Sequence, residues 1–153
     1  MSEIIKGKLY LGDILDANNK SFIEEKKITS IICVAKKLKL RKDLFGVKVY
    51  NFDFEDNEGF DIINYFHEIS NLIDRNKTVL VSCNTGISRS STVVIAYMMK
   101  FFDLSLQHAF IFVKKSRQQI CPKIEFIRQL MKFELQLYCK NSVTYEFWRK
   151  MKN

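Results

Sequence analysis

A cysteine that ends a short apolar run and precedes an arginine by six positions constrains this chain more than any other feature. The run is Val79–Ser82, the cysteine is Cys83, and the arginine is Arg89, with Gly86 midway between them. Ser90 follows the arginine and opens a long apolar segment. An apolar run that gives way to helical periodicity across a short loop predicts a strand, a tight loop and a helix. The thiol and the guanidinium then face the same small space.

The loop from Cys83 to Arg89 suits phosphate chemistry. Backbone N–H groups at the start of a helix converge on an oxyanion, and the helix dipole favours negative charge there. The same field favours the thiolate form of a cysteine, which is a nucleophile. Arg89 can bind two phosphate oxygens with its planar fork, and Gly86 permits the backbone conformation that aims the amides inward. Ser90 can donate to the Cys83 sulfur and stabilise it as a leaving group.

The alternative to a functional loop is a buried cysteine at the end of a core strand, with an arginine nearby by coincidence. The joint spacing of cysteine, glycine, arginine and serine arises by chance with a probability on the order of 0.0005. The pattern therefore favours phosphoryl transfer to sulfur.

From Cys83 to Ser90 the chain has the pattern C-x-x-G-x-S-R-S, which resembles the signature loop of the small (atypical) dual-specificity phosphatases. These enzymes belong to the cysteine-dependent protein tyrosine phosphatase superfamily. Further similar segments are 9–12, 28–34, 120–122, Phe126 and 129–130. The likeness runs from about residue 4 to residue 137, nearly the whole chain.

The resemblance implies an α/β fold of three layers, with a central mixed, mostly parallel sheet of about five strands between helices. It also implies one catalytic domain over residues 1–153, with a core from about 4 to 138 and a tail, 139–153, that can be helical. The apolar spacing predicts strands at 8–12, 28–34, 47–53 and 77–82. It predicts a turn and short helix over 13–27, and helices from 62 to 73, 90 to 102, 106 to 117, 122 to 138 and 141 to 151. Asp61 is the predicted cap of the first long helix, and Pro122 is predicted in the first turn of a later one.

Thiolate attack on a phosphate ester leaves an alkoxide or phenoxide, which needs a proton from a carboxyl group. The resemblance implies that this carboxyl lies on a loop upstream of the catalytic strand, where the chain has the acidic segment Phe54–Phe60. Asp56 is the predicted general acid, and later the base toward the hydrolytic water. Asp53, Glu55 and Glu58 remain alternatives, and an acidic turn without a catalytic role is the structural alternative.

The resemblance also assigns substrate-binding groups. They are Asn84, Thr85, Gly86, Ile87, Ser88 and Arg117. Arg117 resembles a family arginine that borders the active site and can contact a second phosphate or the peptide. The alternative is a surface helix arginine.

Two residues depart from the family's pattern. Ser82 stands where a histidine usually orients the loop and helps to keep the thiol ionised, which predicts slower turnover or a less ionised thiol. Lys123 follows Pro122, where an asparagine that braces the loop region is common. This second departure affects the predicted fine geometry more than the predicted activity.

The chain carries a formal net charge of +8, which favours acidic partners. It has no zinc finger, no RNA-binding aromatic motif and no basic region with heptads, so no nucleic-acid partner is predicted. The densest basic stretch, residues 36–42, is either a solvated loop or a docking patch for an acidic protein or an anionic lipid surface.

No apolar run approaches the length of a membrane span, and Met1–Ile4 has no signal-peptide character. The four cysteines show neither metal-ligand spacing nor a disulfide-rich pattern, so neither a metal nor another cofactor is predicted. A reactive Cys83 requires a reducing compartment, which predicts the cytoplasm, with the nucleus as a second location. Cys121 is the first candidate for a protective disulfide with Cys83. We expect a monomer.

The predicted function is hydrolysis of phosphotyrosine and of phosphoserine or phosphothreonine in proteins, through a phosphocysteine intermediate. One alternative is a pseudophosphatase that binds phosphoproteins with little turnover because of Ser82. Another keeps the chemistry but acts on a phosphoinositide, an RNA 5′-triphosphate or a glucan phosphate. The small neutral residues Asn84 and Thr85 favour a protein substrate over these.

Overall fold

The computed structural model describes residues 1–36, 38–44 and 46–152. Two residues of predicted segments lie outside the described residues: Lys37 of the basic stretch and Asn153 of the tail. Among the described residues, no helix has both the length and the apolar character needed to cross a membrane.

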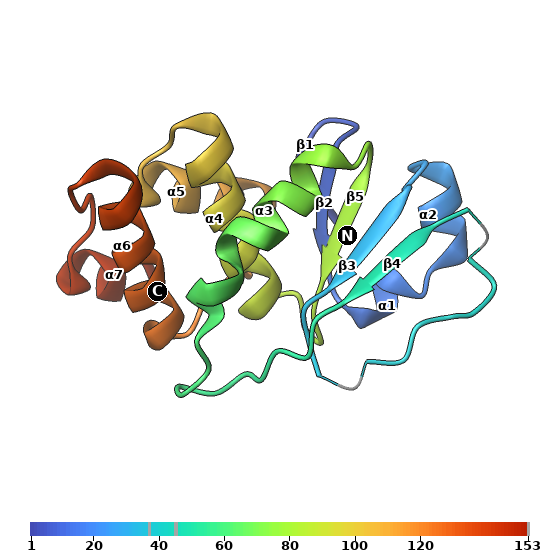
Figure 1. The fold of residues 1–153 in the computed structure, drawn as a ribbon, viewed down its shortest axis with the longest axis horizontal. Coiled ribbons are helices and arrows are strands. Elements are labelled where there is room, and N and C mark those ends of the chain that lie inside the picture. Colours follow the sequence, from blue (N-terminus) through green and yellow to red (C-terminus); the bar gives the residue numbers. More distant parts are fainter. Residues whose placement is uncertain (37, 45, 153) are drawn as a thin grey trace.

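A five-stranded mixed sheet forms the centre of the fold (Figure 1). Its strands are β1 (Ser2–Ile5), β2 (Leu9–Gly12), β3 (Ser30–Cys33), β4 (Lys48–Asn51) and β5 (Val79–Ser82). The spatial order is β1-β2-β5-β3-β4, and β1 alone pairs antiparallel. The predicted mixed, mostly parallel sheet is therefore confirmed. Strand β1 was not predicted, because it is a short edge strand in which Ile4 is the one buried residue.

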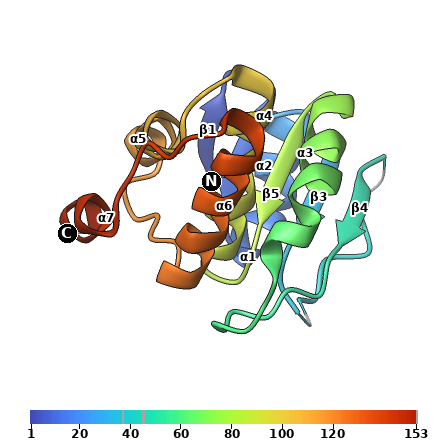
Figure 2. The same ribbon diagram turned by 60° about the vertical axis from the view of Figure 1, so that its left-hand side comes forward.

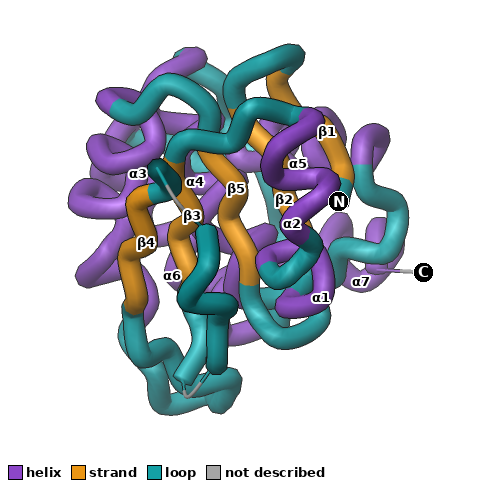
Figure 3. The backbone as a smooth tube through the Cα atoms, turned by 90° about the vertical axis from the view of Figure 1, so that its right-hand side faces the viewer, coloured by secondary structure: helices purple, strands orange, loops and turns teal. Residues whose placement is uncertain are grey.

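Helices cover both faces of the sheet. They are α1 (Ile14–Ala17), α2 (Lys20–Glu25), α3 (Phe66–Arg75), α4 (Arg89–Phe102), α5 (Leu106–Ser116), α6 (Ile124–Tyr138) and α7 (Tyr145–Lys152), with a 3₁₀ turn η1 (Ile62–Tyr65) before α3. Figure 3 shows α1 and α2 in front of the strands, while α3 to α6 lie behind them. The arrangement gives the three layers that were predicted.

The two faces of the sheet bury cores of different size. On the α1–α2 face, Tyr10, Ile31 and Leu80 belong to a small cluster. The alternate residues of the same strands point to the larger cluster beneath α3 to α6, as Leu11, Ile32 and Val81 do. Strands buried on both faces read as continuous apolar runs, which is why the sequence located β3 and β5 so closely.

The start of the first long helix differs from the prediction. Asp61 makes no side-chain capping bond, and the chain enters α3 through η1. Gln129 on α6 accepts the Ile63 N–H through its side-chain oxygen at 3.0 Å, so a tertiary contact satisfies a backbone group that the predicted cap leaves open. Pro122 also differs: it precedes α6, whose N-cap is Lys123.

The C-terminal segment packs against the body of the protein rather than trailing from it (Figure 2). Val143 and Trp148 are buried in the larger core, and Trp148 meets Phe110 of α5 edge to face. The buried Glu134 carboxylate accepts from the Ser142 N–H at 2.7 Å and the Leu106 N–H at 2.6 Å. The predicted terminal helix is present as α7 and is anchored by these contacts.

Candidate active site

The parallel strands bring the predicted functional segments to one edge of the sheet. Parallel strands share a direction, so the loops after their carboxyl ends lie together. The catalytic loop, which we define as residues 83–88, follows β5, and the acid loop, residues 54–60, follows shortly after β4. Because β3 separates these strands in the sheet, the two loops approach across the end of β3. The fold therefore places Cys83 and Asp56 on the same side of the molecule.

The sulfur of Cys83 has two hydrogen-bonding contacts from within its own loop and helix. Ser90 Oγ lies 3.1 Å from Cys83 Sγ, and the Gly86 N–H donates to the same sulfur at 3.2 Å. Cys83 and Ser90 are both buried, and α4 begins at Arg89 directly beside them. Donors around a sulfur stabilise its thiolate form, and a hydroxyl at this distance can support the sulfur as a leaving group. The predicted contact between Cys83 and Ser90 is present.

Gly86 has a left-handed backbone with φ +68°, which glycine adopts without steric cost. A Cβ at this position would come within 2.5 Å of Arg117 Nη2 and 2.7 Å of the Gly12 carbonyl oxygen. The turn therefore needs glycine both for its dihedral angle and for the close approach of β2. This conformation aims the Gly86 N–H at the Cys83 sulfur.

Arg117 supports the catalytic loop from beneath. It is buried, its Nε donates to the Gly86 carbonyl at 2.9 Å, and its Nη1 donates to Ser2 Oγ at 3.1 Å. The structural alternative of a surface helix arginine is therefore wrong, since Arg117 lies just past α5 and only 6% of it is exposed. Both of these bonds go to the protein itself, so in this structure the guanidinium links the loop to β1.

Arg89 joins the two loops. Its Nη1 donates to the Phe54 carbonyl at 2.9 Å, which ties the start of α4 to the acid loop. Its Nε is buried and has no hydrogen-bond partner among the described residues. A buried guanidinium N–H without a partner costs free energy, and at the start of α4 beside the Gly86 N–H it is a donor that an anion could satisfy.

The remaining residues of the catalytic loop divide between exposed side chains and structural anchors. Asn84 and Thr85 are exposed, and Ile87 is half-buried. Ile87 accepts the Cys121 N–H through its carbonyl at 2.9 Å, and buried Ser88 accepts the Lys123 N–H through Oγ at 3.1 Å. The segment before α6 is thereby fastened to the catalytic loop.

Ser82, which replaces the family's histidine, faces away from the reacting groups. It is fully buried, and its Oγ lies 3.2 Å from the sulfur of Cys33, its register partner on β3. Burial raises the pKa of the Cys33 thiol, against the lowering effect of the Ser82 contact, and proximity to Cys83 raises it further. Cys33 is therefore a neutral thiol near pH 7, and Ser82 is bound to it rather than to the catalytic loop.

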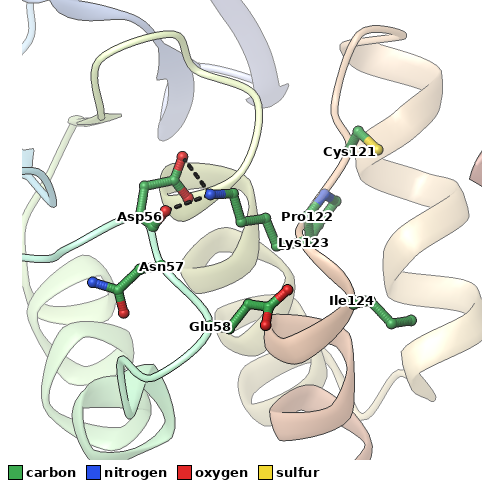
Figure 4. A pocket seen from close by; sticks show the side chains of 7 residues that line it. All are labelled: Asp56, Asn57, Glu58, Cys121, Pro122, Lys123 and Ile124. Carbon is green, nitrogen blue, oxygen red and sulfur yellow. Dashed lines mark hydrogen bonds and ion pairs between the residues drawn. The ribbon is translucent and has the colours of Figure 1, made fainter.

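Asp56 lies on one wall of an open groove of ≈ 500 Å³ (Figure 4). The groove runs between the acid loop and the start of α6 and is lined by Asp56, Asn57, Glu58, Cys121, Pro122, Lys123 and Ile124. Lys123 Nζ reaches across it to Asp56 Oδ2 at 3.5 Å and also donates to the Asp56 carbonyl. Cys83 is not among the residues that line this groove, so the groove does not contain the nucleophile.

The other acidic candidates have different surroundings. Glu55 pairs with Lys36 at 3.0 Å, and this contact, followed by a hydrogen bond from Asn57, lowers the pKa of the Glu55 carboxyl group. Asp53 is exposed at the end of β4, and Glu58 lines the groove without an ion pair among the described residues. Asp56 is thus the acid-loop carboxylate that has a direct tie to the segment bound to the catalytic loop.

The basic stretch 36–42 is partly neutralised. Lys36 pairs with Glu55, and Arg41 binds Asp43 through two bonds of 2.8 Å. The Lys36 N–H also donates to the Phe54 carbonyl at 3.0 Å, so this stretch runs beside the acid loop. Lys39 and Lys42 contribute the remaining described positive charge.

The cysteines are all free thiols. Cys121 is half-buried in the wall of the groove, and its thiol is not bonded to Cys83. Among the described residues, no three His, Cys, Asp or Glu side chains cluster in a way that could hold a metal ion.

Comparison with known proteins identifies one family. A family model described as "Dual specificity phosphatase, catalytic domain" matches residues 9–136. A "MAP kinase phosphatase with leucine-rich repeats protein 1" from Dictyostelium discoideum is 38% identical over 138 residues, which are 88% of this chain and 16% of that protein. The "Dual specificity protein phosphatase 1B" of Arabidopsis thaliana is 37% identical over 139 residues, 88% of this chain and 81% of that protein.

A solved structure resembles the fold closely. The crystal structure of the human "tyrosine phosphatase-like serine/threonine/tyrosine-interacting protein" superimposes with a TM-score of 0.83 and 32% identity, covering 92% of this chain and 98% of that one. The similarity therefore extends over nearly the whole chain, both in sequence and in three dimensions.

Proposed function

Because the chain belongs to the dual-specificity phosphatase catalytic-domain family, we propose that it is a protein phosphatase that works through a phosphocysteine intermediate. Its substrates are phosphotyrosine and phosphoserine or phosphothreonine in proteins. Cys83 is the nucleophile, Arg89 and the loop amides bind the phosphoryl group, Asp56 moves the proton, and Ser90 assists the breakdown of the intermediate.

The reaction has two steps. In the first, the Cys83 thiolate attacks phosphorus, the bond from phosphorus to the ester oxygen breaks, and the Asp56 carboxyl donates its proton to that oxygen. In the second, water attacks phosphorus, the Asp56 carboxylate takes the proton of the water, and the S–P bond breaks. Ser90, 3.1 Å from the sulfur, donates a hydrogen bond to the departing thiolate. The products are the free hydroxyl group of the substrate and inorganic phosphate.

The observation that carries this proposal is the buried Arg89 Nε, which has no partner among the described residues. Arg89 is the first residue of α4, and the catalytic loop directly before it carries the Gly86 N–H and the Cys83 sulfur. A phosphate that approaches the sulfur would satisfy this N–H and would meet the positive end of α4. Preorganised donors of this kind stabilise the charge that develops during phosphoryl transfer.

The surroundings of the loop support a protein substrate. The exposed side chains of the loop, Asn84 and Thr85, are small and neutral and add no lysine that would grip the further phosphates of a phosphoinositide. The name of the Dictyostelium relative refers to MAP kinases, so a doubly phosphorylated activation-loop peptide of such a kinase is a suitable test substrate. A peptide with one phosphotyrosine and one phosphothreonine reports both activities in one experiment.

A phosphoprotein-binding module is the second candidate function. Ser82 is bound to Cys33 and leaves the catalytic loop without a histidine beside the nucleophile. The human structural relative is named a phosphatase-like interacting protein, which supports considering binding without turnover for a chain of this fold.

The test is hydrolysis of an aryl phosphate, with EDTA present, by the wild type and by Cys83→Ser. We expect turnover by the wild type, complete loss in the variant, and a trapped phosphocysteine when wild-type reactions are quenched in acid. Wild-type protein that is folded but inactive from pH 5 to 8, while it still binds the doubly phosphorylated peptide, would refute the enzyme and favour the binding module. Ser82→His is then the informative next variant.

A further inference from the structure

We propose that Lys123 is a positioning residue that ties Asp56 to the catalytic loop. The inference rests on the proposed phosphatase reaction and adds to it a group that the reaction scheme does not include. Lys123 touches no reacting atom. It acts through the backbone and the carboxylate of Asp56.

The first argument is the way in which Lys123 spans the site. Its ammonium reaches Asp56 twice, at the carbonyl and at Oδ2, as Figure 4 shows. Its own backbone N–H donates to Ser88 Oγ at 3.1 Å. The preceding Cys121 N–H is fastened to the Ile87 carbonyl at 2.9 Å. One residue therefore connects the acid loop to the catalytic loop, and its backbone end is fixed at two neighbouring points.

The second argument is that the acid loop has few other anchors near Asp56. Phe54 is buried, and its carbonyl accepts from Arg89 Nη1 and from the Lys36 N–H. Beyond Phe54, residues 55–59 are all exposed, and the bonds of Asn57 to Glu55, Gly59 and Phe60 stay within the loop. Among the described residues, the side chain that ties Asp56 to another segment is Lys123. Exposed segments with few packing contacts lie at the low-stability end of a fold.

The third argument is chemical. Asp56 must be protonated to act as the acid and ionised to act as the base. The ammonium attracts the Asp56 side chain as an ion pair when that side chain is ionised, whereas the bond to the Asp56 carbonyl is independent of protonation. The ammonium can therefore keep the loop in place through both steps.

The test compares three variants with the wild type. Lys123→Met removes the ammonium and keeps the length of the side chain, and Lys123→Arg restores a cation. Lys36→Met is a matched control, because Lys36 pairs with Glu55 in the same loop at 3.0 Å and the side chains of Lys36 and Lys123 are 48% and 43% exposed. Both ion pairs are solvent-accessible, so each variant should keep the thermal midpoint of the wild type.

The readout is kcat/KM for a series of aryl phosphates with leaving groups of increasing basicity, from p-nitrophenyl phosphate to phenyl phosphate. A basic leaving group needs the proton of Asp56, whereas a weakly basic one departs with little help. We expect Lys123→Met to lower kcat/KM about fivefold to tenfold for phenyl phosphate and to leave it almost unchanged for p-nitrophenyl phosphate. A misplaced acid still transfers its proton, but less efficiently than a correctly placed one. Lys123→Arg should restore most of the loss, and Lys36→Met should behave as the wild type.

A double variant separates positioning from other effects. If Lys123 acts through Asp56, adding Lys123→Met to Asp56→Asn should cause no further loss on phenyl phosphate. Three results would overturn the role of Lys123 while leaving the phosphatase assignment intact. They are an equal loss of kcat/KM on every substrate in Lys123→Met, no loss at all, or the same dependence on leaving-group basicity in Lys36→Met. An inactive wild type would overturn both, so the two failures are distinguishable.

Discussion

Replacing Gly86 with alanine tests the geometry of the catalytic loop most directly. Gly86 has φ +68°, and an added Cβ would lie 2.5 Å from Arg117 Nη2 and 2.7 Å from the Gly12 carbonyl oxygen. The arginine can shift by rotating its end, although it then loses its bond to the Gly86 carbonyl. The Gly12 carbonyl belongs to β2 and cannot move without disturbing the sheet. The substitution therefore combines backbone strain with overpacking.

The magnitude follows from these two terms. A left-handed conformation costs a residue with a Cβ about 1–2 kcal/mol, and overpacking a dense site costs about 1–3 kcal/mol. We expect Gly86→Ala to lower the free energy of unfolding by about 2–5 kcal/mol, which in a protein of this size lowers the thermal midpoint by about 4–20 °C. Aryl phosphate turnover should also fall, because a shifted turn no longer aims the Gly86 N–H at the Cys83 sulfur.

The chain offers a matched control in Gly7. It has φ +66°, and a Cβ added there would meet no atom within 4 Å, so Gly7→Ala measures the strain term alone. Thermal unfolding and aryl phosphate turnover of both variants give the comparison. Equal destabilisation by the two substitutions, or an active Gly86→Ala with an unchanged midpoint, would refute the close approach on which the site geometry depends.

Three further outcomes are expected. Arg117→Leu leaves the buried Gly86 carbonyl without its donor, so urea unfolding should show a loss of about 1–3 kcal/mol and kcat/KM should fall, whereas Ser2→Ala, which removes only the second contact of Arg117, should change either quantity little. Glu134→Gln weakens the bonds to the Leu106 and Ser142 N–H groups, and hydrogen exchange in α7 should become faster while exchange in β5 stays slow. Burial raises the pKa of Tyr97 to about 12, and the charge of Asp74 adds to the rise. In the unfolded chain the tyrosine ionises near its usual pKa of about 10. The contribution of Tyr97 to the free energy of unfolding should therefore be fully present at neutral pH and be lost as pH rises from about 10 to 12. In Tyr97→Phe this alkaline loss should be smaller, and an identical pH dependence in a denaturation series would contradict the assignment.

The core strands and the catalytic loop were predictable because their signals are local. Strands β3 and β5 are buried on both faces, so their apolar runs are continuous, and the motif occupies eight consecutive positions, from Cys83 after β5 to Ser90 in the first turn of α4. Strand β1 and the η1 turn were missed for the opposite reason. The edge strand buries one residue, and the helix entry is completed by Gln129, 66 positions away from Ile63.

The roles of three polar residues could not be predicted from pattern alone. Arg117 looked equally suited to the surface and to the substrate, and packing placed it under the catalytic loop against Gly86. Ser82 could have faced the loop, but its register on β5 sets it against Cys33. Lys123 stood out only as a departure from the family's pattern, and the fold brings its ammonium to Asp56. Pattern analysis detects what a residue type can do, while its partner depends on which segments the sheet brings together.

By itself the sequence determined which chemical groups form the candidate site, because a thiol, a glycine turn and an arginine at a helix start are arranged by a single strand-loop-helix unit. The tertiary structure alone decided what surrounds that unit. The tie from Lys123 to Asp56 spans 67 residues, and the bond from Arg117 to Gly86 spans 31. Contacts of such separation form only when the parallel strands align their carboxyl ends and the helices close over them, so their identity depends on packing geometry and not on local spacing.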